Sequence, residues 1–137
     1  MASRLNPYLS FSDNARPAME FYQSVFGGKL DVNTFGEFGG SDAATADKIM
    51  HAQLETDQGY TIMASDTPPG MEFKPGNAMA VSLSGDDGDA LRGFWQKLSD
   101  GGTVQMPLEK QMWGDEFGML TDRFGMQWMV NITQSAG

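Results

Sequence analysis

The sequence predicts an α+β fold in which two βαβββ modules follow one another and form curved mixed sheets around a cleft. Three observations predict it. The order strand, helix, strand and hairpin occurs twice in 137 residues, and two pairs of segments match between the halves. A hydrophobic content of 40% also suits one packed core in a chain of this length. We therefore expect a single domain over 1–137, with module 1 at about 1–66, a linker at 67–76 and module 2 at about 77–135.

The first module opens with a strand over 5–11, where polar and apolar residues alternate. Ser12, Asp13 and Asn14 are candidate N-caps for a helix whose apolar residues repeat at helical spacing up to the stop at Gly27 and Gly28. The remaining predicted elements are a strand at 29–35, a loop with a short helical turn at 36–48, and a hairpin with strands at 49–56 and 60–66.

The second module repeats this order. We expect a strand at 77–85, a helix at 90–98 that ends before Gly101 and Gly102, a strand at 103–113 interrupted by Pro107, and a hairpin over 117–132. The acidic run at 86–89 precedes the helix, where carboxylates favour the N-terminus, so helix capping is expected there.

The halves also match in sequence. FYQ at 21–23 faces FWQ at 94–96 at an offset of 73, and HAQLETDQGYTIM at 51–63 faces FGMLTDRFGMQWM at 117–129 at an offset of 66. Two matches in the same element order indicate an internal duplication. A duplicated module predicts two half-sheets about a pseudo-twofold axis, with a ligand cleft where they face each other.

Composition excludes several classes of protein. A formal net charge of -9 argues against nucleic acid and against anionic membrane surfaces. The chain has no cysteine, so it has no disulfide, thiolate metal site or cysteine nucleophile. The first residues lack the apolar region of a signal peptide, and no 18-residue apolar run occurs. We expect a cytoplasmic protein.

Four stretches carry a resemblance to a known family: FYQSVFGG at 21–28, MHAQL at 50–54, MASDTPPGM at 63–71 and WGDEFGMLTDRFGMQWMVNI at 113–132. With them, nearly the whole chain resembles the PhnB-like family of the vicinal-oxygen-chelate superfamily. That superfamily includes glyoxalase I, extradiol dioxygenases and the bleomycin- and fosfomycin-resistance proteins. The family is sometimes labelled 3-demethylubiquinone methyltransferase-like, but a nucleotide-type cofactor site needs a Gly-rich strand-to-helix turn in a parallel sheet. The glycines at 36–40 instead lie between strands that read as antiparallel.

The resemblance implies four ligand positions for a divalent metal ion, two histidines and two glutamates, and the ion would polarise a chelating substrate. In this chain they fall on Pro7, on Ala78 or Met79, on Met63 and on Met129. None of these is a hard ligand, and a thioether suits Cu(I) better than Mg, Mn, Ni or Zn. We therefore predict no metal ligands at these positions and no cofactor, although the family resemblance leaves a divalent metal open.

Other residues are candidates for ligand binding or catalysis. His51 is the only histidine and the best candidate for proton transfer; it shares a strand face with Gln53 and could bind a metal weakly with Glu55 or Asp115. The competing interpretation is a histidine hydrogen-bonded within the hairpin. Aromatic rings could stack on a planar ligand or could belong to the core. The predicted ligand-binding residues are Tyr8, Gln53, Met63, Trp113, Asp115, Trp128 and Met129.

Two functions remain open. The first is binding of a small, partly apolar ligand in the cleft of a βαβββ dimer without the usual metal, as the resemblance to drug-sequestering resistance proteins implies. The second is a metal-dependent lyase, isomerase or dioxygenase with non-standard ligands around His51. The sequence does not decide whether the protein is an enzyme. The resemblance also implies a homodimer, which would suit half-sheets that have free edges.

Overall fold

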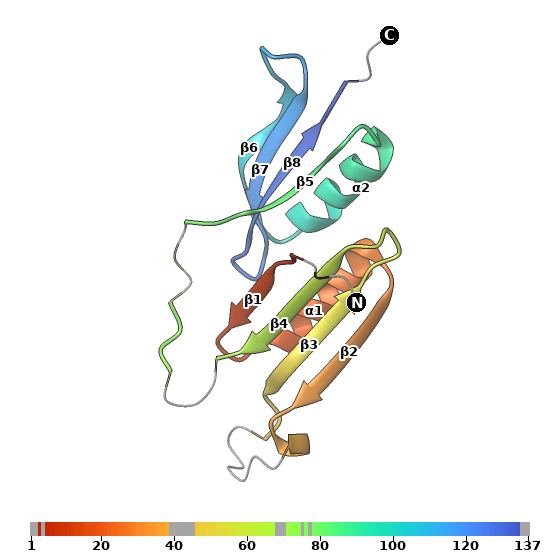
Figure 1. Ribbon diagram of the computed structural model, residues 1–137. Coiled ribbons are helices and arrows are strands. Elements are labelled where there is room, and N and C mark those ends of the chain that lie inside the picture. The colour runs from red at the N-terminus through yellow and green to blue at the C-terminus, as the bar shows by residue number, and fades with distance from the viewer. Residues whose placement is uncertain are drawn as a thin grey trace. The chain divides into compact units, whose positions relative to one another are not determined.

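The computed structural model describes residues 3, 5–38, 46–67, 71–74, 76 and 78–134. It has two compact units, Met1–Pro75 and Gly76–Gly137, whose boundary falls at the end of the predicted linker. Each unit contains a four-stranded sheet with an α-helix on one face (Figure 1). Both follow the predicted order of strand, helix and three strands, so the α+β fold of two βαβββ modules is confirmed.

In the first unit the strand order is β1-β4-β3-β2, with β1 and β4 parallel and the other neighbours antiparallel. The elements are β1 (Tyr8–Phe11), α1 (Ala15–Phe26), β2 (Lys29–Thr34), the 3-10 turn η1 (Gly36–Phe38), β3 (Ile49–Glu55) and β4 (Thr61–Asp66). Gly27 ends α1 as predicted: its φ is 76°, and its N–H donates to the carbonyl of Gln23 at 2.7 Å.

The second unit has the equivalent order β5-β8-β7-β6. Its elements are β5 (Val81–Gly85), α2 (Gly88–Ser99), β6 (Thr103–Lys110), β7 (Glu116–Thr121) and β8 (Gln127–Ile132). β5 starts four residues later than predicted, and Asn77 lies outside the described residues. Pro107 does not interrupt β6. The strand lies at the sheet edge, where a residue without an N–H is tolerated, and its register shifts on either side of Met106.

The two hairpins show the duplication residue by residue. Gln53 pairs with Met63 across β3 and β4, and Met119 pairs with Met129 across β7 and β8, which reproduces the offset of 66. Gly59 and Gly125 both have a φ of 89° in equivalent turns. The helices α1 and α2 keep the offset of 73. The repeat predicted from short matches is therefore a repeat of structure.

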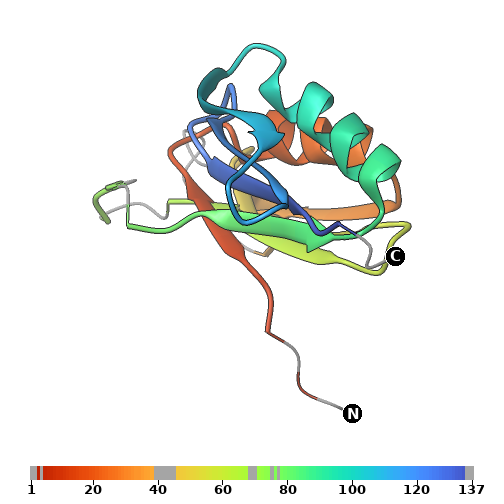
Figure 2. The same cartoon turned by 90° about the horizontal axis from the view of Figure 1, so that it is seen from above.

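Buried and partly exposed side chains alternate along the inner strands, so each sheet has one face packed on its helix. Seen from above, α2 lies along one face of the second sheet (Figure 2). The core of the first unit includes Phe11, Tyr22 and Leu54, and that of the second includes Leu120 and Trp128. We call the opposite face of each sheet its open face.

Helix capping differs from the prediction. Asn14 occupies the N-cap position of α1 but makes no side-chain capping bond. The carboxylate of Asp66, at the end of β4, accepts from the N–H of Ala15 at 2.9 Å and from that of Ile49 at 2.8 Å. Asp87 at the N-cap of α2 likewise makes no side-chain bond. A residue distant in sequence therefore caps the first helix.

Neither helix of the described part of the chain is long and apolar enough to cross a membrane.

Candidate functional site

The open face of the first sheet carries a row of four side chains, one from each strand. Tyr8 on β1 pairs with Met63 on β4, Met63 pairs with Gln53 on β3, and Gln53 pairs with Asp31 on β2. Three of these residues, Tyr8, Gln53 and Met63, are predicted ligand-binding residues. The structure brings them together because pairing partners in a sheet project to the same side.

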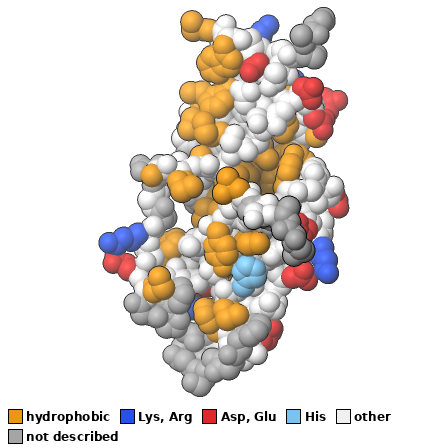
Figure 3. All heavy atoms as spheres, in the orientation of Figure 1, with side chains coloured by type: hydrophobic (Ala, Val, Ile, Leu, Met, Phe, Trp, Pro, Cys, Tyr) orange, Lys and Arg blue, Asp and Glu red, His pale blue; other side chains and the backbone are white. Residues whose placement is uncertain are grey.

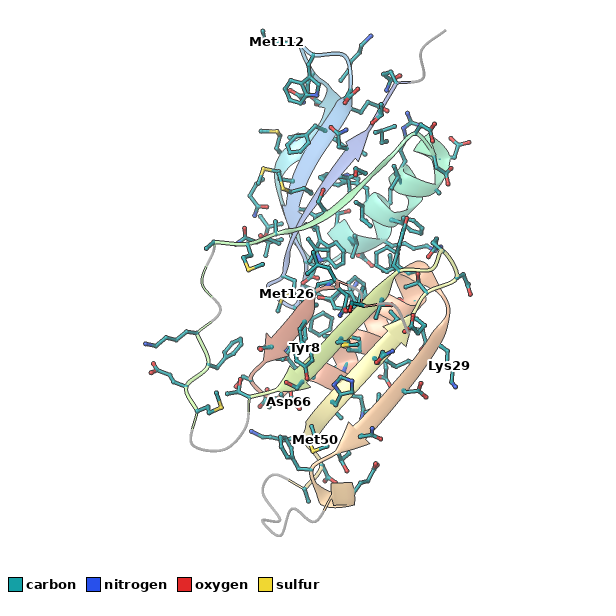
Figure 4. All side chains as sticks on the ribbon, viewed as in Figure 1. Tyr8, Lys29, Met50, Asp66, Met112 and Met126 are labelled. Atoms are coloured by element: carbon teal, nitrogen blue, oxygen red, sulfur yellow. The ribbon has the colours of Figure 1, made fainter. Side chains whose placement is uncertain are left out.

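His51 joins this row through Tyr8. Its Nδ1 lies 3.2 Å from the Tyr8 hydroxyl, and the two rings have a centroid distance of 5.8 Å. Tyr8 is 51% exposed and His51 is half-buried. Figure 4 labels Tyr8 on β1, and Figure 3 shows hydrophobic side chains above and below the imidazole. His51 and Tyr8 thus present two polar, hydrogen-bonding groups on an otherwise partly apolar face.

The predicted partners of His51 are engaged elsewhere. Glu55 accepts from Gln53 Nε2 at 2.6 Å and from the Thr61 hydroxyl at 2.8 Å. Asp115 belongs to the second unit, where its carboxylate accepts from Asn131 Nδ2 at 3.1 Å. In the described part of the chain, no group of three or more His, Asp and Glu side chains could hold a metal ion.

The open face of the second sheet has an equivalent row of different chemistry. Ser82 on β5 pairs with Met129 on β8, Met129 pairs with Met119 on β7, and Met119 pairs with Met106 on β6. Three thioethers therefore stand side by side across neighbouring strands. Of these three, only Met129 was a predicted ligand-binding residue, because the strand pairing that aligns Met106 and Met119 with it is not visible in the sequence.

Aromatic side chains continue this apolar surface. Trp113, in the turn before β7, is 63% exposed and contacts Phe117 with a ring-centroid distance of 6.1 Å. Phe117 is two residues before Met119 and so shares its face of β7. Trp113, predicted to bind ligand, is therefore exposed beside a side chain of this open face.

Trp128, which was predicted to bind ligand, lies in the core of the second unit. It is 1% exposed on the helix side of β8, and its Nε1 donates to Asp122 Oδ2 at 2.9 Å. Asp122 also accepts from the backbone N–H groups of Phe124 and Met126, at 2.8 and 3.1 Å. Asp122 therefore holds both the turn between β7 and β8 and the buried indole in place.

The positions that would hold the superfamily's metal ion do not fit one. The carbonyl of Pro7 accepts from the N–H of Met63 at 3.1 Å. Tyr8 pairs with Met63, and Ser82 pairs with Met129, so Tyr8 and Ser82 are equivalent positions of the two modules. The residue before Ser82, Val81, is therefore the equivalent of Pro7, and not Ala78 or Met79 as predicted. Pro7 and Val81 have no side-chain donor, and thioethers are poor ligands for hard divalent ions.

The comparison with known families agrees with this architecture. The family model described as 3-demethylubiquinone-9 3-methyltransferase matches residues 3–131. The chain belongs to this family. A solved structure from Bacillus cereus with this description is also called PhnB protein, the family that the sequence motifs resemble. The chain also shares its fold with a glyoxylase/bleomycin resistance protein/dioxygenase domain from Frankia sp. EAN1pec, at 14% identity and a TM-score of 0.68 over 100% of this chain and 96% of that one.

Individual proteins and solved structures match nearly the whole chain. Protein YjdN of Escherichia coli (strain K12) is 30% identical over 142 residues, covering 95% of this chain and 95% of its own. The crystal structure of protein PA1353 from Pseudomonas aeruginosa is 37% identical, with a TM-score of 0.87 over 98% of this chain and 100% of that one. The PhnB protein of Bacillus cereus shares the fold, at 22% identity and a TM-score of 0.74 over 96% of this chain and 100% of its own.

Proposed function

We propose that this PhnB-like protein binds a small, partly apolar ligand on the open faces of its sheets, without the hard metal centre of its superfamily. The observation that carries the proposal is the pair Met63 and Met129. Thioethers occupy both carboxylate positions at equivalent registers, each in the middle of a row on an open face. Flexible, polarisable side chains there suit apolar contact with a ligand rather than coordination of Mg, Mn, Ni or Zn.

The polar groups of the first open face would give such a ligand its orientation. Tyr8, His51 and Gln53 offer a hydroxyl, an imidazole and an amide within one patch. Protein sites for small molecules typically combine an apolar lining with a few polar groups of this kind. We propose that His51 acts as a hydrogen-bonding and proton-exchanging group toward the ligand. We also propose a homodimer as the active form, since each half-sheet has free edges. A cytoplasmic location is proposed because a chain without cysteine suits a reducing compartment.

The test uses N-phenyl-1-naphthylamine, a neutral dye whose fluorescence rises in apolar sites, so that the chain's negative charge does not repel it. We expect saturable binding. Met63→Gln and Met129→Gln should each weaken it by at least about tenfold, because a methionine contact of about 1.5–3 kcal/mol is replaced by a polar amide. Met112→Gln is the matched control, because Met112 is fully exposed at the tip of the turn between β6 and β7 (Figure 4).

Equal binding by all three variants would contradict the proposal. So would close to one tightly held Mn, Ni, Zn or Fe(II) ion per chain, measured by elemental mass spectrometry after incubation with each metal. That result would favour the alternative function, a metal-dependent lyase, isomerase or dioxygenase around His51.

A further inference from the structure

Met106, Met119 and Met129 form a row of thioethers across three strands of the second sheet, on its open face. We propose that this row is a binding site for a soft monovalent metal ion, Cu(I). The proposal is separate from the binding of an organic ligand, because it depends on sulfur lone pairs and not on apolar area.

The strand register holds the three side chains close together. Met129 pairs directly with Met119, and Met119 pairs directly with Met106. Directly opposed residues have Cβ atoms about 4.5–5.5 Å apart, so three flexible side chains on neighbouring strands can converge above the central one. The register shifts on both sides of Met106 leave it paired with Met119.

All three side chains lie away from the helix. A Cβ at Gly118 would meet the ring of Trp95, a residue of α2, at 2.7 Å, so Gly118 faces the helix and its neighbour Met119 faces the open side. Met106 is 40% exposed, and Met119 and Met129 are half-buried. An ion could therefore enter from solvent and still be partly shielded.

The chemistry of the row selects the ion. Thioethers are soft ligands that favour Cu(I) over hard divalent ions. The chain has no cysteine, so methionine supplies all of its sulfur ligands, and its only imidazole, His51, lies in the other unit. A net charge of -9 favours the approach of a cation. Phe117 shares a face of β7 with Met119 and contacts Trp113, and aromatic faces also attract cations.

The equivalent row of the first sheet provides an internal comparison. Tyr8, Met63, Gln53 and Asp31 occupy the matching positions, so that row has one thioether among oxygen and nitrogen groups. The internal duplication does not explain why the second row has more methionines, because the residue of the first module that is equivalent to Met119 is Gln53. The thioether row is thus specific to the second module.

Ag(I), which has the same ligand preference without redox chemistry, is the first probe. The protein is labelled with ¹³C at the methionine methyl groups, which gives one signal for each of 11 methionines. Titration with silver nitrate in chloride-free buffer should shift the signals of Met106, Met119 and Met129 first, with saturation at one ion per chain. The proposal is overturned if Met71, Met79 and Met112, which are exposed outside the row, shift at the same silver concentrations.

The second measurement is Cu(I) affinity by anaerobic competition with bathocuproine disulfonate. Met119→Leu and Met106→Leu keep the apolar volume, so the fold should persist, with amide spectra as the check. Each should weaken Cu(I) binding by more than about tenfold, since the loss of a group that merely supports a metal ligand already costs that much. Met112→Leu should leave the affinity unchanged. If Met119→Leu, Met106→Leu and Met112→Leu bind Cu(I) with equal affinity, the proposed site is refuted. That result would not affect the naphthylamine test of organic-ligand binding.

Discussion

The carboxylate of Asp66 joins three elements, and its replacement is the sharpest test of how the first unit is held together. Asp66 is 1% exposed at the end of β4. One oxygen accepts from Ala15 in the first turn of α1, and the other accepts from Ile49 at the start of β3. The negative charge at the helix N-terminus also interacts favourably with the helix dipole. We predict that Asp66→Asn destabilises the protein although it preserves the shape of the side chain.

The magnitude follows from the two hydrogen bonds. A bond to a charged acceptor contributes about 1.5–3 kcal/mol, and a buried group left without a partner costs about 1–3 kcal/mol. Asparagine keeps one acceptor oxygen but turns its amide N–H₂ toward the other backbone N–H. We therefore expect a loss of about 2–4 kcal/mol, a large share of a typical stability of about 5–15 kcal/mol.

Two assays check this prediction. Urea unfolding followed by circular dichroism should show a lower free energy of unfolding. Amide hydrogen exchange at Ala15 and Ile49 should accelerate by roughly 30- to 800-fold, the same free energy expressed as a ratio. Asp13→Asn is the matched control, because Asp13 is an exposed carboxylate just before the same helix. If Asp66→Asn and Asp13→Asn unfold at the same urea concentration, the capping role assigned to Asp66 is wrong.

Three further predictions concern a buried ring, two glycines and the exposed tyrosine. Trp128→Phe should cost about 1–3 kcal/mol because Asp122 loses a buried donor, and thermal unfolding measures it. Gly28→Ala should prevent stable folding, because the added Cβ would lie 2.1 Å from a backbone oxygen. Gly59→Ala should lower the free energy of unfolding by only about 1–2 kcal/mol, because Gly59 has a φ of 89° but no atom within 4 Å of the added Cβ. Tyr8→Phe should change stability by less than about 0.5 kcal/mol, as an exposed site does, but should shift the imidazole NMR signals of its hydrogen-bond partner.

Each of these three has an outcome that would contradict it. Equal stability of Trp128→Phe and the parent protein would mean that the indole N–H contributes nothing. Similar losses for the two glycine variants would mean that backbone strain, and not the close contact, decides both. Unchanged imidazole signals in Tyr8→Phe would show that the Tyr8 hydroxyl does not bond His51 in solution.

The fold could be predicted because its signals are local and repeated. Alternation in β3 and β4, helical spacing in α1, and the Gly27 stop each depend on residues near one another in the chain. The duplication then supplied an independent check, and the offset of 66 between Met63 and Met129 survives in the strand pairing. Apart from the predicted interruption at Pro107, the errors lie at the ends and caps of elements, where distant groups decide. Asp66 caps α1 from 51 residues away, and no local pattern reveals that.

The candidate site was only partly predictable. The alternation of side chains along the strand placed His51 and Gln53 on the same face. It did not show which face Trp128 occupies, because an aromatic residue in a strand can pack in the core or line a ligand-binding surface. The sequence by itself determined the family, the two modules and the thioethers at the metal positions, since these follow from residue identity and order. Only the tertiary structure aligned Met106, Met119 and Met129 and placed Tyr8 against His51, because cross-strand neighbours are set by register and by the face that each helix covers.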